Sequence, residues 1–131
     1  MYKEYKMKIR SLIILIVLIV LFLIPSLSFS NSPITVSTSG EQTADAAIME
    51  SPGVFYGVIV MPDGSHDVTV SIYDNASAAS GTKILPTLTF AGDGGAQAFA
   101  APYPIRCRNG IYVDITTAGT VAYVILRGTG Q

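Results

Sequence analysis

The chain has 131 residues, half of them hydrophobic, and a formal net charge of −1. Four of its eight basic residues lie within the first ten, so residues 31–131 keep four basic against eight acidic side chains, a formal −4. A domain of this size and sign has one modest core and no electrostatic attraction for nucleic acid or anionic lipid.

Residues 1–30 have the order of an export signal. A basic start is followed by an unbroken apolar run, Leu12–Ile24, and then by small residues in Ser28-Phe29-Ser30. As a helix the run spans about 20 Å, less than the ~30 Å core of a bilayer. We expect a signal helix that is cleaved before Asn31. An uncleaved anchor is the alternative, and it is the only membrane contact we expect; either way the protein is secreted or lies at the cell surface.

Residues 31–44 are rich in serine and threonine, and Ile34 and Val36 alternate there with polar residues. Either a loose arm or one short edge strand fits this pattern. Strand addition, in which Ile34 and Val36 pair with the sheet edge of a neighbouring copy, is one mechanism that such an arm offers.

Residues 45–131 consist of short apolar-rich runs separated by turn residues, with no amphipathic helical pattern. This predicts an all-β fold: a small antiparallel β-sandwich of seven or eight strands, jelly-roll-like or Greek-key. Strands are expected at residues 46–50, 54–61, 66–73, 83–91, 96–101, 105–108, 111–116 and 121–126.

Prolines and glycines refine these expectations. Pro86 favours an edge strand or a bulge within residues 83–91. Pro102-Tyr103-Pro104 is expected to break the strand that precedes it. Asn109-Gly110 is typical of a tight hairpin turn.

Two expected strands, 54–61 and 121–126, are apolar on both faces, although a sandwich in water needs only one apolar face per sheet. In the first strand, alternation places Phe55, Ile59 and Met61 on one face and Tyr56, Val58 and Val60 on the other. In the second strand, it places Val121, Tyr123 and Ile125 on one face and Ala122, Val124 and Leu126 on the other. Either the arm or a loop covers the second face, or that face is a subunit interface. The residues expected to take part in self-association are Ile34, Val36, Tyr56, Val58, Val60, Ala122, Val124 and Leu126.

The single cysteine, Cys107, excludes an intrachain disulfide. Cys107 shares a strand face with Ile105, which favours a buried thiol. Pairing between chains is the alternative.

No residue pattern indicates a catalytic or metal site. His66, the only histidine, follows a turn and belongs to none of the HExxH, CxxC or GxSxG patterns. Asp63, Asp67, Asp74 and Asp93 lie in or beside turns, without the spacing of a calcium loop. We expect no enzyme activity, no cofactor and no metal.

Three tyrosines, Tyr73, Tyr103 and Tyr112, are candidates for stacking on sugar rings. Ordinary cross-strand packing is the alternative.

Four stretches have a familiar sequence: Ser71-Ile72-Tyr73-Asp74, Ser80-Gly81-Thr82, residues 109–116 and residues 119–124. With them, residues 54–127 resemble small β-sandwich proteins of phage and prophage structural regions. The resemblance implies a virion-type structural or decoration role and brings no catalytic residues. The export signal departs from it, because virion subunits usually assemble in the cytoplasm.

We therefore predict an exported, non-enzymatic β-sandwich that forms a homo-oligomer or polymer, as a structural subunit of a cell-surface or extracellular assembly. A module that binds a glycan or another surface ligand is one alternative, and a phage-type virion decoration protein is the other.

Overall fold

The strands form two layers. The computed structural model describes residues 35–129, which contain two antiparallel sheets of four strands each and no helix. The strands are β1 (Val36–Thr38), β2 (Ala46–Met49), β3 (Gly53–Pro62), β4 (Val68–Tyr73), β5 (Leu88–Phe90), β6 (Gln97–Cys107), β7 (Ile111–Thr117) and β8 (Val121–Thr129). The all-β expectation is confirmed. The expected signal helix, its cleavage site and Ile34 lie outside the described residues.

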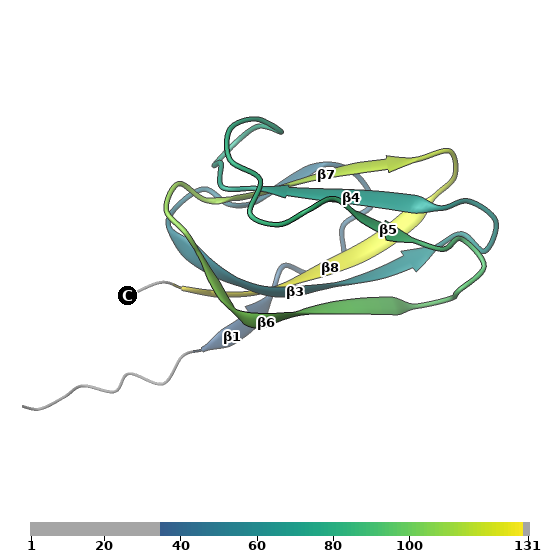
Figure 1. Ribbon diagram of the computed structural model, residues 1–131, viewed down its shortest axis with the longest axis horizontal. Helices are drawn as coiled ribbons and strands as arrows, with labels where there is room; N and C mark the ends of the chain where they lie inside the picture. The colour runs from purple at the N-terminus through teal and green to yellow at the C-terminus, as the bar shows by residue number, and fades with distance from the viewer. Residues whose placement is uncertain (1–34, 130–131) are drawn as a thin grey trace, which may run out of the picture. The chain divides into compact units, whose positions relative to one another are not determined.

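The chain crosses between the layers at almost every turn. Sheet A has the strand order β1-β8-β3-β6, and sheet B has the order β2-β7-β4-β5. Of the strands that follow one another in the chain, only β4 and β5 are paired (Figure 1). The β3–β4, β5–β6 and β7–β8 turns therefore gather at one end of the sandwich, on the right in Figure 1, and the start of β3 lies at the other end.

Asn109-Gly110 is one of these crossings. It joins β6 in sheet A to β7 in sheet B, so the hairpin prediction is wrong. Gly110 has a φ of 148°, and a Cβ there would collide with the carbonyl oxygen of Met49. Glycine is required because two backbone segments approach each other closely at this turn.

The core lies between the sheets. Val68, Val70 and Ile72 of β4 are fully buried, as are Ile111 and Val113 of β7. The alternation of these strands predicted this arrangement. Other large, fully buried side chains are Phe55, Tyr123 and Ile125.

A β-bulge in β3 changes which of its residues face the core. Phe55 pairs with Arg127, whereas the next paired residue, Gly57, lies opposite Leu126. Tyr56 is thus an extra residue, and the inward positions after it are shifted by one. Phe55, Val58 and Val60 all point into the core and are fully buried. The expectation that Phe55 shares a face with Ile59 and Met61 is therefore wrong, and Val58 and Val60 are absent from the surface.

Two edge strands differ from their predicted extents. β6 continues through Pro102-Tyr103-Pro104, so the expected break there is wrong. In this segment residues 101–104 lie opposite Tyr56 alone, because Ala100 pairs with Gly57 and Ile105 with Phe55. Prolines are tolerated there because one side of an edge strand has no ladder to complete. β5 pairs over three residues only, after Pro86, and is the edge of sheet B as that proline indicated.

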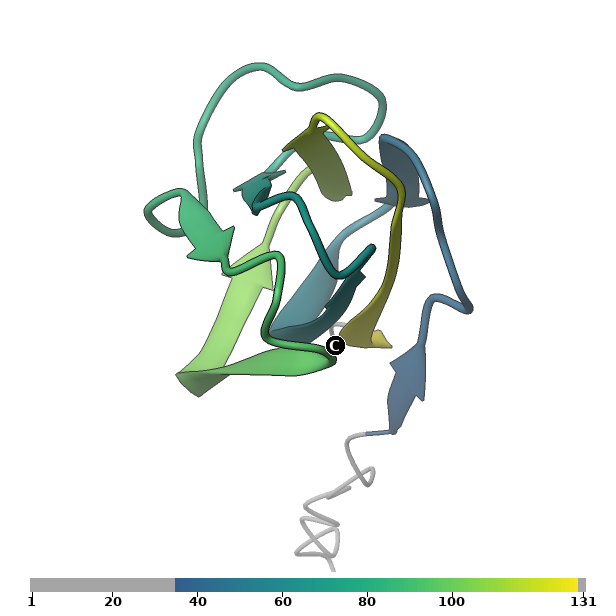
Figure 2. The same cartoon turned by 90° about the vertical axis from the view of Figure 1, so that its right-hand side faces the viewer.

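The described part of the arm is an edge strand of its own chain. β1 pairs with β8, with Val36 opposite Gly128. The segment after β1 continues along β8 before it enters β2 (Figure 2): the Ser39 N–H donates to the Ile125 carbonyl at 3.0 Å, and the Gln42 N–H to the Tyr123 carbonyl at 2.9 Å. The Tyr123 hydroxyl donates to the Ala44 carbonyl at 2.7 Å. The arm therefore occupies the edge of β8.

Candidate association surface

The outer face of sheet A is apolar across its width. Residues directly opposite one another in neighbouring strands share a face, and Ile59 lies between Val124 and Ala98. Met61 pairs with Ala122 in the next row. We call this surface the apolar face; its residues are Val36, Val54, Tyr56, Ile59, Met61, Ala98, Ala100, Ala122, Val124 and Leu126.

Several of these side chains are open to solvent. The exposed fraction is 55% for Met61, 53% for Val36 and 41% for Ile59. Ala122, Val124 and Leu126, three of the predicted self-association residues, lie on this face and are half-buried. Among residues 35–129, the polar side chains that pair into this face lie at its margins, with Thr38 opposite Leu126 and Arg106 opposite Val54.

The outer face of sheet B is polar. Thr69 pairs with Thr89 on one side and Thr116 on the other, and Thr89 and Thr116 are exposed. Ser71 pairs with Asp114 and is buried, with its hydroxyl 3.2 Å from that of Thr87. Exposed threonines at these positions are the ordinary alternation of an antiparallel sheet with one face in water. The outer face of sheet B therefore shows what a water-facing sheet of this molecule looks like, and the apolar face of sheet A differs from it.

The described part of the arm leaves the apolar face open. β1 is hydrogen-bonded beside β8 as the fourth strand of sheet A, and residues 39–42 follow the β8 edge. The sequence left two explanations for the second apolar face: an arm or loop covers it, or it is a subunit interface. The described residues do not support the first, since Ile59 and Met61 remain exposed.

Tyr56, the extra residue of the bulge, lies across the sheet. A Cβ on Gly128 would be 2.9 Å from Cε2 of the Tyr56 ring and 3.3 Å from its hydroxyl. The hydroxyl is buried and has no hydrogen-bond partner among the described residues. A buried hydroxyl without a partner costs about 1–3 kcal/mol. Tyr56 therefore adds an unused polar group to an otherwise apolar surface.

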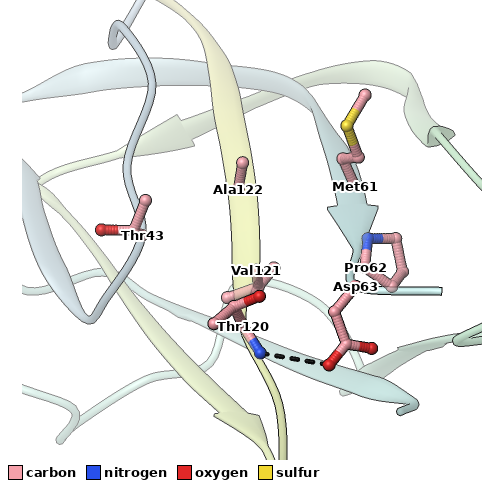
Figure 3. A pocket seen from close by; sticks show the side chains of 7 residues that line it. All are labelled: Thr43, Met61, Pro62, Asp63, Thr120, Val121 and Ala122. Carbon is pink, nitrogen blue, oxygen red and sulfur yellow. Dashed lines mark hydrogen bonds between the residues drawn. The ribbon is translucent and has the colours of Figure 1, made fainter. Parts of the chain in front are cut away.

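A hollow of about 300 Å³ lies at one end of the apolar face, between the end of β3 and the start of β8 (Figure 3). Its lining residues are Thr43, Met61, Pro62, Asp63, Thr120, Val121 and Ala122. Met61 and Ala122 belong to the apolar face as well, so the hollow continues that surface.

Asp63 organises the turn beside the hollow. One carboxylate oxygen accepts the backbone N–H groups of Ser65 and His66, both at 2.9 Å. The other accepts His66 Nδ1–H at 2.8 Å and the Thr120 N–H at 3.3 Å. The hydrogen bond from His66, followed by those from the backbone, holds the pKa of Asp63 well below its ordinary value. Asp63 and His66 both belong to the β3–β4 turn, and the hydrogen bond that Asp63 accepts from Thr120 joins this turn to the β7–β8 turn.

The four turn aspartates do not converge. Asp63, Asp67 and Asp93 belong to one end of the sandwich, whereas Asp74 accepts the Asn109 N–H at the other, at 2.7 Å. Within residues 35–129, no three His, Cys, Asp or Glu side chains form a group that could hold a metal ion.

The three tyrosines proposed for ligand stacking lie on different sheets. Tyr73 and Tyr112 pair on the outer face of sheet B, and Lys83 Nζ lies 5.6 Å from the centre of the Tyr73 ring. Tyr103 lies in β6 of sheet A and is 78% exposed. A ligand on sheet B would contact only the first two.

Cys107 is fully buried, as its alternation with Ile105 predicted. Burial raises the pKa of its thiol to about 11. The thiol is therefore inaccessible for pairing between folded chains.

No family model, curated protein or solved structure matches this chain. Over the described residues, no helix is long and apolar enough to cross a membrane.

Proposed function

We propose that the protein is an exported, non-enzymatic structural subunit that associates with further copies of itself through the apolar face, within a cell-surface or extracellular assembly. The observation that carries this proposal is the difference between the two outer faces. Ile59 and Met61 are exposed on the outer face of sheet A, whereas Thr89 and Thr116 are exposed on that of sheet B. Exposed apolar patches of this kind mark sites of association. The basic and apolar order of residues 1–24 supports export.

The size of the apolar face suits a second copy. The eight residues from Val54 to Met61 extend about 26 Å, and β8, β3 and β6 together are about 14 Å wide. The three residues of β1 widen the face at one end only, so the face covers roughly 400 Å². Two such faces in contact bury about 800 Å² in total, at the small end of the range for protein–protein contacts. A symmetric contact of this kind needs only one surface per subunit.

We infer further that the fold is a jelly roll. Eight strands in the orders β1-β8-β3-β6 and β2-β7-β4-β5, with crossings between the sheets, support two interlocked Greek keys. Jelly rolls occur in capsid subunits and in lectins, so the fold itself leaves the choice of function to the surface. A phage-type virion decoration protein would use the same apolar face, and its association would take place on a phage particle.

One observation favours a second candidate, a glycan-binding module. Tyr73, Tyr112 and Lys83 form an aromatic and cationic group on sheet B, and such rings stack on sugars. Loss of glycan-array binding on Tyr112→Ala would support this candidate, and an array without hits would remove it.

The test of self-association is a lysine on the apolar face. At high salt, Ile59→Lys is expected to reduce the exported protein to monomers, because association through the apolar face would bury the charge. Thr116→Lys, an exposed position on sheet B, is the matched control and is expected to leave the assembly unchanged. Size-exclusion chromatography with light scattering gives the mass. Equal masses for the two variants would contradict the proposal.

A further inference from the structure

The charged residues of the sandwich are sorted between its two ends. All four basic side chains of the described residues lie at or near the end where β3 starts and β6 ends: Lys83, Arg106, Arg108 and Arg127. Glu50 and Asp74 are the acidic groups there, which leaves this basic end a formal charge of +2.

The opposite end is acidic. Asp63 and Asp67 lie in the β3–β4 turn, Asp93 lies in the β5–β6 turn, and Glu41 precedes the residue that bridges to Tyr123 at the start of β8. His66 is the only other titratable group among them, and the four carboxylates give this acidic end a formal charge of −4. Asp45 and Asp114 lie between the ends, beside the middle of β7.

The two ends cannot neutralise each other within one molecule. The ten residues of β3 span about 33 Å. The nearest opposite charges of the two ends, Glu41 beside Tyr123 and Arg127 further along β8, are about four residues or roughly 13 Å apart, which exceeds the Debye length of ~8 Å at physiological salt. Within residues 35–129, no lysine or arginine forms an ion pair with a carboxylate. Arg127 donates from Nη1 to the Ile48 carbonyl at 3.2 Å, and its buried Nε has no partner among the described residues.

We propose that copies of this chain also associate end to end, with the basic end of one against the acidic end of the next. This contact deepens the proposed self-association and uses the two ends of the sandwich, which adjoin the apolar face only at Arg106 and at the hollow. It is heterologous, because each subunit presents two different patches, and such contacts build rings or filaments. Together with the symmetric contact of apolar faces, it allows assembly to extend in more than one direction.

The hollow lies at the acidic end, with Asp63 in its wall and Met61 beside it. Arg106 is exposed at the basic end, and long arginine side chains pack their apolar stems while placing the charge near a carboxylate. The acidic end therefore offers both an apolar recess and negative charge to a basic side chain from another copy.

The experiment uses the exported protein in the Ile59→Lys background, so that contacts between apolar faces do not contribute. One variant adds Arg106→Glu and Arg108→Glu, which reverses the basic end. The other adds Glu41→Lys and Asp93→Lys, two acidic residues that make no side-chain hydrogen bond in the described part of the chain, whereas Asp63 and Asp67 accept bonds within the turns. Sedimentation velocity at low salt measures the size of the complexes.

The Ile59→Lys protein alone is expected to form end-to-end oligomers at low salt, with an association constant about tenfold lower in high salt. Each end variant alone is expected to be monomeric. Their equimolar mixture is expected to form pairs only, because one partner keeps an acidic end and the other keeps a basic end. The charge-preserving control, Arg106→Lys with Arg108→Lys, is expected to oligomerise as its parent does.

Oligomers that persist in both end variants, or a mixture that stays monomeric, would overturn the end-to-end contact. Neither result bears on the apolar face, which is tested by Ile59→Lys against the wild type. Loss of fold in an end variant would be seen by circular dichroism, and Arg106→Glu alone then replaces the double variant, with a weakened association as its expected result.

Discussion

At the scale of the residue, two glycines shape the apolar face. A Cβ on Gly57 would lie 2.5 Å from the Phe99 carbonyl oxygen, and one on Gly128 would lie 2.9 Å from the Tyr56 ring. Gly57 therefore permits the bulge, and Gly128 permits Tyr56 to lie across the sheet. A glycine inside an apolar strand is itself a signal of a bulge or a close approach, and Gly57 was the residue from which the bulge could have been predicted.

Asp63 makes stability depend on pH. Its pKa is lowered, first by the hydrogen bond from His66 and then by those from the backbone. A carboxyl group whose pKa is lower in the folded state stabilises the fold above its unfolded pKa, and this contribution is lost as the pH falls through the folded value. Asp63→Asn is therefore expected to be less stable than the wild type near pH 7, with the difference narrowing toward about pH 2.

Urea unfolding followed by circular dichroism at the two pH values measures this difference. Asp93→Asn is the control, since Asp93 makes no side-chain hydrogen bond with the described residues. A constant difference between the wild type and Asp63→Asn at both pH values would show that the carboxylate charge does not stabilise the turn.

At the scale of the element, β3 has the largest consequence. Alternation counted along its sequence places Ile59 with Phe55, but the bulge at Tyr56 turns Val58 and Val60 inward and leaves Ile59 and Met61 outside. Register after a bulge shifts by one residue, so every later side chain changes face. An interface assigned from alternation alone therefore contains core residues.

Adjacent lysine substitutions in β3 test this register. Val58→Lys is expected to unfold the protein, because it buries a charge in the core at a cost of several kcal/mol. Ile59→Lys is expected to fold with near wild-type stability and to lose only the association through the apolar face. Thermal unfolding of the two variants measures the contrast, and the opposite order of stabilities would contradict the register.

The sequence predicts the strands better than their pairing. The alternation in β4 and β7 and the burial of Cys107 were correct because they depend on local periodicity and apolar content. The crossing at Asn109-Gly110 was missed because turn residues indicate that the chain reverses, not which sheet the next strand joins. Pro102-Tyr103-Pro104 was expected to break a strand, but an edge strand such as β6 tolerates prolines, and the sequence alone does not show which strand lies at an edge.

At the scale of the whole molecule, two asymmetries define what the sandwich can bind. One sheet has an apolar outer face and the other a polar one, and one end is basic while the other is acidic. The first asymmetry was partly predicted, through Ala122, Val124 and Leu126. The second was not, because residues far apart in the sequence, such as Lys83 and Arg127, reach the same end only through the topology.

Association through the apolar face is the central claim, and the solution mass of the exported wild-type protein in about 1 M salt tests it most directly. At that ionic strength the Debye length is ~3 Å, so contacts between charged ends are suppressed while apolar contacts persist. Sedimentation equilibrium is expected to give the mass of two or more copies. A monomer at every concentration would contradict the account.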